Sequence, residues 1–216
     1  RIGVRPSPIR NGTVNGCFSV EKRAKISSVL KNAKYNIDTS ALSTNGIITV
    51  NFEDVYNNKG IIANPNCSTI QAMLPLKALE DKYKIKRIVY STYQAVSGAG
   101  KDALCDLENI DGSKPLKKFP HPIYNNCLPH IDVFIDNGYT KEELKMINET
   151  RKILHRPDLK ITATTVRVPV SNSHSESINV EFENDFELEE LKDTLKNFPN
   201  LILVDDPTSN AYPMPI

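Results

Sequence analysis

The sequence has no paired-cysteine motif, no long apolar run and no large excess of one charge, and each absence excludes a class of function. Its four cysteines, Cys17, Cys67, Cys105 and Cys127, are irregularly spaced, which argues against a zinc site or a dithiol redox motif. No apolar run approaches the length of a membrane span, and the first residues do not resemble a signal peptide. A net charge of +1 does not suggest nucleic acid or a membrane as a partner. We expect a protein of the reducing cytoplasm without a bound metal.

The composition is that of an ordinary globular chain. Its 216 residues, 39% hydrophobic and 25% charged, suffice for one large domain or two small ones. From residue 52 onward the pattern predicts a mixed α/β domain. The expected strands are 60–63, 85–92, 161–170, 177–182 and 201–204, and the expected helices are 69–83, 101–110, 141–154 and 186–197. Thr140 and Glu143 form a capping box at the start of the third of these helices.

The tetrapeptide Asn64-Pro65-Asn66-Cys67 is the most informative local feature. It lies between a short apolar run, residues 60–63, and a segment of helical periodicity. At such a junction the unpaired N–H groups and the positive end of the helix dipole favour a thiolate on Cys67. Asn66 could offer an amide donor to an oxyanion. On this evidence alone a buried, inert cysteine is an equally good interpretation.

Longer segments decide between these two interpretations. They are Gly60–Gln71, Ser91–Gly100, Tyr139–Met146 and Arg167–Glu176. In their order and spacing they resemble the active-site and substrate-binding segments of the aspartate-semialdehyde dehydrogenase family. The resemblance covers residues 52–216, the catalytic and dimerisation domain of that family. It implies an α/β fold with a mixed, largely antiparallel sheet and helices packed on one face.

The resemblance also implies a reaction: the NADP-dependent reductive dephosphorylation of L-aspartyl-4-phosphate to L-aspartate 4-semialdehyde through a cysteine thioester. Cys67 would be the nucleophile. His174 would be the acid/base, because a free imidazole has a pKa of about 6.5. Gln94 cannot titrate and would orient the acyl group. Asn66, with the backbone N–H groups at the helix start, would hold the oxyanion.

The charges of the substrate account for three further residues. Arg167 lies in an expected strand, where a fixed guanidinium suits a bidentate grip on the α-carboxylate. Glu142 would meet the α-ammonium, and Lys145 would reach the phosphate. Taken singly, these residues and His174 are more simply interpreted as a solvated ion pair, a surface arginine and a loop histidine. Their occurrence together, in the order of the family, favours the functional interpretation.

The resemblance further implies a homodimer or homotetramer, with NADP as cofactor and aspartyl phosphate and phosphate as small-molecule partners. The Gly- and Pro-containing loop 112–122 and residues 126–132 are candidates for subunit contact.

The first fifty residues depart from the pattern of the family. They contain no glycine-rich dinucleotide-binding turn, since Gly12–Gly16 has the wrong spacing. The segment Gly98–Ala103 does satisfy GxGxxA, and we interpret Ser97 and Gly98 as lining the nicotinamide end of the cofactor site. Ser43 stands where the family carries a phosphate-binding arginine. We therefore predict two parts: residues 1–51, an atypical segment that is a remnant or rearranged, and residues 52–216.

Three alternatives stay open at this stage. A related reductase could act on N-acetylglutamyl phosphate. A catalytically silent domain could serve dimerisation only, or be a fragment lacking its cofactor domain. Binding of nucleic acid through the basic N-terminal segment would require an affinity that depends strongly on salt.

Overall fold

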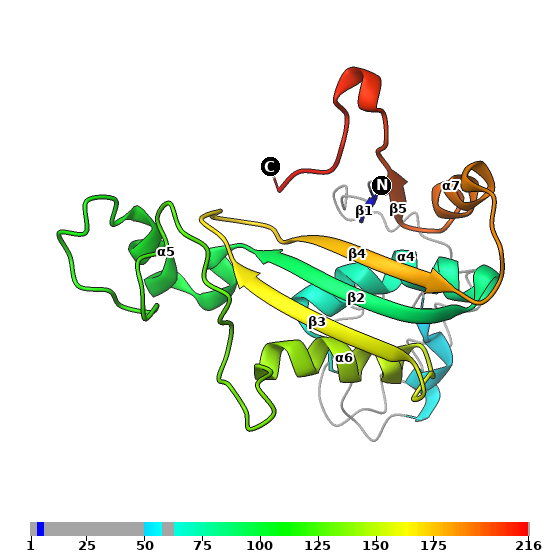
Figure 1. The fold of residues 1–216 in the computed structure, drawn as a ribbon, viewed down its shortest axis with the longest axis horizontal. Coiled ribbons are helices and arrows are strands. Elements are labelled where there is room, and N and C mark those ends of the chain that lie inside the picture. Colours follow the sequence, from blue (N-terminus) through cyan, green and yellow to red (C-terminus); the bar gives the residue numbers. More distant parts are fainter. Residues whose placement is uncertain (1–3, 7–49, 58–62, 216) are drawn as a thin grey trace. The chain divides into compact units, whose positions relative to one another are not determined.

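The structure, a computed structural model, describes residues 4–6, 50–57 and 63–215 (Figure 1). They divide into two compact units. The first unit is drawn from residues 1–85, 149–157 and 182–213, and the second from residues 86–148, 158–181 and 214–216. Most of the predicted segment 1–51 and nearly all of the predicted strand 60–63 lie outside the described residues. Within the described part, no helix is long and apolar enough to cross a membrane.

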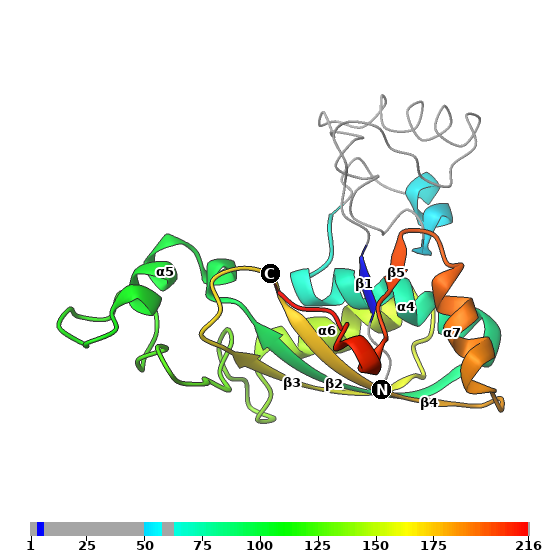
Figure 2. The ribbon, with the colours of Figure 1, turned by 90° about the horizontal axis from the view of Figure 1, so that it is seen from above.

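The first unit is built on the helix α4, Cys67–Tyr83, whose residues Met73, Leu76 and Leu79 are buried. Helix α4 contacts α7, Leu188–Lys196, and the strand β1, Val4–Pro6. Strand β1 pairs antiparallel with β5, Leu201–Leu203, and β5 in turn contacts α7 (Figure 2). The 3₁₀ helices η1, Phe52–Asn57, and η3, Pro207–Ser209, also belong to this unit, as do residues 149–157.

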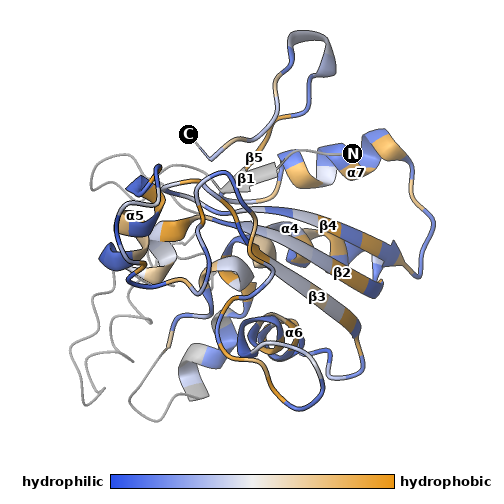
Figure 3. Cartoon of the chain, turned by 60° about the vertical axis from the view of Figure 1, so that its left-hand side comes forward, coloured by the Kyte–Doolittle hydropathy of each residue, from blue (hydrophilic) through white to orange (hydrophobic). Residues whose placement is uncertain are grey.

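Helix α7 shows how the first unit buries apolar surface. Hydrophilic and hydrophobic residues both occur along it (Figure 3). Leu191 and Leu195, four residues apart, share one helix face and are buried.

At the end of α4, the Glu80 carboxylate accepts from the Ile85 N–H and pairs with Arg156, both at 2.7 Å. A buried carboxylate with two such partners fixes the exit of the chain from the helix.

The second unit contains most of a three-stranded sheet in the order β3-β2-β4, which comprises β2, Ile85–Gln94, β3, Lys160–Arg167, and β4, Ser175–Phe182. Strands β2 and β3 are parallel, and their last partners are Gln94 and Arg167. Ile88, Tyr90, Thr92 and Gln94 are all buried, as alternation along a strand requires. The register therefore places Gln94 and Arg167 side by side at the same end of the sheet.

Helix α6, Lys141–Ile153, begins with the predicted capping box, which is confirmed. The Glu143 N–H donates to Thr140 Oγ1 at 3.3 Å, and the Thr140 N–H donates to Glu143 Oε2 at 2.8 Å. The other oxygen of Glu143 accepts from the Thr165 N–H of β3 at 3.1 Å. One carboxylate thus caps α6 and ties its first turn to the sheet.

The segment after β2 is the 3₁₀ helix η2, Val96–Ala99, followed by α5, Lys101–Glu108. A small core beneath it contains the buried residues Val96, Ala103, Ile123 and Leu128. The predicted mixed α/β architecture is confirmed, with one informative shift. Helix α4 begins at Cys67, two residues earlier than expected, because Asn66 caps it.

Candidate active site

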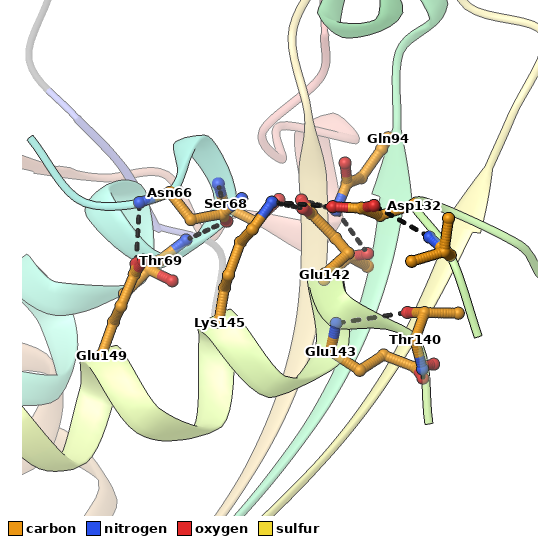
Figure 4. Close-up of polar contacts among 12 residues, drawn as sticks. Asn66, Ser68, Thr69, Gln94, Asp132, Thr140, Glu142, Glu143, Lys145 and Glu149 are labelled. Carbon is orange, nitrogen blue, oxygen red and sulfur yellow. Dashed lines mark hydrogen bonds and ion pairs between the residues drawn. The ribbon is translucent and has the colours of Figure 1, made fainter. Parts of the chain in front are cut away.

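In the first unit, the candidate nucleophile Cys67 is exposed and is the first residue of α4. Asn66 is the N-cap: its Oδ1 accepts from the N–H groups of Ser68 at 2.9 Å and Thr69 at 3.2 Å (Figure 4). The N-terminus of this 17-residue helix, where the helix dipole is positive, therefore lies at Cys67.

This cap changes the expected roles at the helix start. The N–H groups of Ser68 and Thr69, expected to hold an oxyanion, donate to Asn66 instead. With Oδ1 of Asn66 used in this way, its Nδ2 is the end of the side chain suited to donate to an oxyanion. The Asn66 main-chain N–H donates to the Glu149 carboxylate at 2.7 Å, a contact that spacing in the sequence could not reveal.

In the second unit, the main chain of one residue at the end of β2, Ala95, orients two of the expected side chains. The Ala95 N–H donates to Nδ1 of His174 at 2.9 Å. The Ala95 carbonyl accepts from Nη1 of Arg167 at 2.7 Å. Arg167 is also held through its own backbone, which exchanges two hydrogen bonds with Leu128. The imidazole and the guanidinium are thereby set beside each other.

The environment of His174 favours the neutral form of its ring. Burial lowers the pKa of His174, the positive charge of Arg167 lowers it further, and the carboxylate of Glu142 acts in the opposite direction. Because Nδ1 accepts a hydrogen bond from Ala95, a neutral ring carries its proton on Nε2. His174 is therefore a hydrogen-bond donor at Nε2.

Four more groups form a connected set on the same unit (Figure 4). Nε2 of the buried Gln94 donates to Glu142 Oε1 at 3.3 Å. Glu142 Oε2 lies 3.5 Å from the Lys145 ammonium, which also contacts Asp132 at 3.0 Å. The hydrogen bond from Lys145 lowers the pKa of Asp132, and the same bond raises the pKa of Lys145. Lys145 is accordingly a fixed cation among carboxylates.

Gly98 of η2 lies against His174 and Arg167. A Cβ built on it would stand 3.3 Å from His174 Cε1 and 3.4 Å from Arg167 Nη1. The neighbouring Ser97 N–H donates to the carbonyl of Ser171 at 3.1 Å, which anchors this turn. The glycine thus leaves the imidazole and the guanidinium uncrowded on this side.

Of the residues expected from the sequence, the second unit brings together Gln94, Gly98, Glu142, Arg167 and His174, with Lys145 attached through Glu142. Cys67 and Asn66 belong to the first unit. Sequence reasoning missed three contributors: the main chain of Ala95, Asp132 and Glu149. No sequence pattern marks them, because each acts through a contact between segments distant in the chain. In the described residues, no group of three or more His, Cys, Asp or Glu is arranged to hold a metal ion.

Comparison with known proteins gives a consistent picture. A family model described as "Semialdehyde dehydrogenase, dimerisation domain" matches residues 76–216. Aspartate-semialdehyde dehydrogenase of Aquifex aeolicus is 56% identical over 176 residues, which are 77% of this chain and 52% of the relative. The enzyme of that name from Bacillus subtilis is 46% identical over 180 residues, which are 77% of this chain and 52% of the relative.

Solved structures agree. The structure of aspartate semialdehyde dehydrogenase II from Vibrio cholerae, complexed with ASA, superposes with a TM-score of 0.66 at 42% identity, over 70% of this chain and 48% of the other. The Francisella tularensis enzyme gives 0.61 at 26% identity, over 69% and 50%. The chain spans about half the length of the relatives that it matches.

Proposed function

This chain belongs to the semialdehyde dehydrogenase family, and from that premise we propose that it carries the catalytic residues of an NADP-dependent aspartate-semialdehyde dehydrogenase. The proposed reaction converts L-aspartyl-4-phosphate to L-aspartate 4-semialdehyde. One observation carries the proposal: Gln94, Glu142, Arg167 and His174 converge at one end of β2 and β3.

In the proposed first step, the Cys67 thiolate attacks the acyl carbon, the Sγ–C bond forms, and the C–O bond to phosphate breaks with release of phosphate. The start of α4 supplies the positive potential that favours the thiolate. When bound, NADPH would supply the hydride that reduces the thioester carbonyl. The C–S bond then breaks, which releases the semialdehyde and regenerates the thiolate.

His174 serves this chemistry as a hydrogen-bond donor. Its Nδ1 is engaged by the Ala95 N–H, so the neutral ring offers Nε2–H to the acyl oxygen on which negative charge develops. The same Nε2–H can donate a hydrogen bond to the departing thiolate. Ionisation of Cys67 is assigned to the helix start and not to His174, since a ring that already carries its proton on Nε2 cannot accept another there while neutral.

The charged residues match the charges of the substrate. Arg167 is held on Ala95 and Leu128, and a guanidinium fixed in this way suits the α-carboxylate. Glu142 meets the α-ammonium, and Lys145 meets the phosphate. Gln94, oriented by its bond to Glu142, positions the acyl group.

The absence of a side chain at Gly98 fits a flat ring approaching beside His174 and Arg167, because a Cβ would fill that space. We therefore assign Ser97 and Gly98 to the nicotinamide-facing surface. Because a reactive thiolate must stay reduced, the cytoplasm is the proposed location. A homodimer or homotetramer is the proposed assembly, supported by the match to a dimerisation domain.

The proposal is tested by phosphate-dependent oxidation of aspartate semialdehyde, followed as formation of NADPH, in the full protein. Cys67→Ala should abolish turnover, whereas Cys105→Ala and Cys127→Ala should retain it. Acylation that persists in Cys67→Ala would end the assignment. Competition with N-acetylglutamyl phosphate identifies which acyl phosphate is the substrate. Preferential turnover of that compound would mean that the protein is the related reductase.

A further inference from the structure

Glu149 makes a contact that the proposed reaction does not yet use. Its Oε2 accepts from the main-chain N–H of Asn66 at 2.7 Å, across 83 positions of sequence (Figure 4). Both residues belong to the first unit. A carboxylate accepting from a backbone N–H at this distance is a strong, charge-assisted hydrogen bond.

Two other polar groups of Asn66 are also engaged. Its Oδ1 accepts from the N–H groups of Ser68 and Thr69, and its carbonyl accepts from the Ile70 N–H at 2.9 Å. These bonds all point forward into α4. The bond to Glu149 joins the N-cap to another helix, α6, and so fixes the residue that precedes the thiol from the opposite side.

We propose that Glu149 is a positioning residue for the nucleophile, acting through the backbone of Asn66 to hold the Cys67 Sγ at its place of attack. The proposal rests on the proposed role of Cys67. Glu149 need not touch substrate or cofactor. A displacement of about 1 Å at a reacting atom can cost about 100-fold in rate, so an anchor one residue away from the thiol has a large effect on turnover.

Position and charge are separable at this residue. Glu149→Gln keeps an oxygen that can accept from the Asn66 N–H but removes the negative charge. Glu149→Asp keeps the charge but withdraws the carboxylate by one methylene. Glu149→Ala removes both. If Glu149 acts by position, Gln rescues and Asp does not.

The test measures kcat and KM for these three variants in the full protein, together with the rate at which iodoacetamide alkylates Cys67, mapped by mass spectrometry. We expect kcat to fall about 100-fold in Glu149→Ala and at least about 10-fold in Glu149→Asp, with KM nearly unchanged. Glu149→Gln should retain most of the wild-type kcat. Glu190→Ala, which removes an exposed ion pair with Lys82 in the same unit, is the matched control and should be silent.

Wild-type kcat in both Glu149→Asp and Glu149→Ala would overturn the proposal. If Glu149→Ala does not fold, Glu149→Asp decides the question, and a loss of kcat in Glu149→Gln with wild-type kcat in Glu149→Asp would show that charge and not position is at work. Turnover unaffected by Cys67→Ala would refute the proposed function instead. In that case the alkylation rate of Cys67 still reports on Glu149: a wild-type rate in Glu149→Asp and Glu149→Ala would refute the positioning role as well.

Discussion

At Ala95, the two polar groups of the main chain orient two side chains of the candidate site. Its N–H selects the Nε2–H tautomer of His174, and its carbonyl holds Nη1 of Arg167. The Ala95 side chain is itself fully buried. The sequence marked His174 and Arg167 by residue type but not the residue whose main chain orients them, because a main-chain contact leaves no signature in the identity of the residue.

At Gly98 a methyl group should disturb the site more than the fold. In Gly98→Ala the new Cβ would lie 3.3 Å from His174 Cε1 and 3.4 Å from Arg167 Nη1, so these side chains must move by a few tenths of an ångström. We expect kcat/KM to fall by about 10-fold or more with little change in Tm. Steady-state kinetics and calorimetry measure the two effects.

Gly138→Ala is the contrasting control. Gly138 has φ +84° and no atom within 4 Å of a built Cβ, so alanine there suffers backbone strain without crowding. Such strain costs about 1 kcal/mol, which lowers Tm and leaves kcat/KM unchanged. An equal loss of activity in both variants would refute the role given to Gly98.

His174 should titrate below the pKa of a free imidazole. Burial and then Arg167 lower its pKa, while Glu142 raises it. Because the folded pKa is depressed, the stability from the neutral ring is present above about pH 6.5 and is lost as the pH falls through the folded pKa. Arg167→Met should raise the pKa of His174, and Glu142→Gln should lower it. Titration of the imidazole by NMR measures the pKa of His174 in the wild type and in both variants. A wild-type pKa at or above that of a free imidazole would contradict the structure.

At the scale of elements, the start of α6 shows how a local sequence signal sets the geometry of a site. Thr140 and Glu143 predict the helix start, and the structure contains both bonds of the capping box. That start fixes where Glu142 and Lys145 stand on the first turn and a half of the helix. Their shared helix face follows from a spacing of three, and the contact between them is observed at 3.5 Å.

Removing the cap should therefore affect stability and substrate binding together. Thr140→Ala loses the hydroxyl that accepts from the Glu143 N–H, which costs about 1 kcal/mol. Thr140→Ser keeps the hydroxyl and is the matched control. Urea unfolding should show a lower midpoint for Thr140→Ala only, and its KM should rise, since Glu142 and Lys145 lie in the released turn. An unchanged midpoint in Thr140→Ala would show that the capping box is dispensable.

Much of the element pattern was predictable because it depends on near neighbours. The described helices and the strands β2 to β5 lie within a few residues of their predicted bounds, since hydrophobic period, capping residues and Pro199 act locally. The contacts that aim the site were not predictable. Asp132 reaches Lys145 across 13 positions, and Glu149 reaches Asn66 across 83. Only the packed chain brings such residues together.

At the scale of the whole molecule, one buried carboxylate anchors residues 117–119 of the irregular segment 109–140. Asp106 accepts from the N–H groups of Lys117, Lys118 and Phe119 at 2.7 to 2.9 Å. Burial alone would raise the pKa of Asp106, but these three donors outweigh it and lower the pKa. The stability that they contribute is present above about pH 4 and is lost as the pH falls. A loop held so firmly can present a fixed surface to a second subunit.

That segment exposes large apolar side chains, which is typical of a surface that binds another protein. They are Ile110, Tyr124, Val133 and Phe134, with exposed fractions of 63%, 46%, 52% and 58%. Together with the match to a dimerisation domain, this supports self-association through residues 109–134. If the proposed dimer forms through these residues, Phe134→Ser should weaken it about 10-fold or more by sedimentation equilibrium, because burial of an aromatic ring contributes about 1.5 to 3 kcal/mol. Tyr212→Ser changes a side chain that is equally exposed, at 55%, but lies in the other unit. Equal weakening by both variants, or by neither, would place the subunit interface elsewhere.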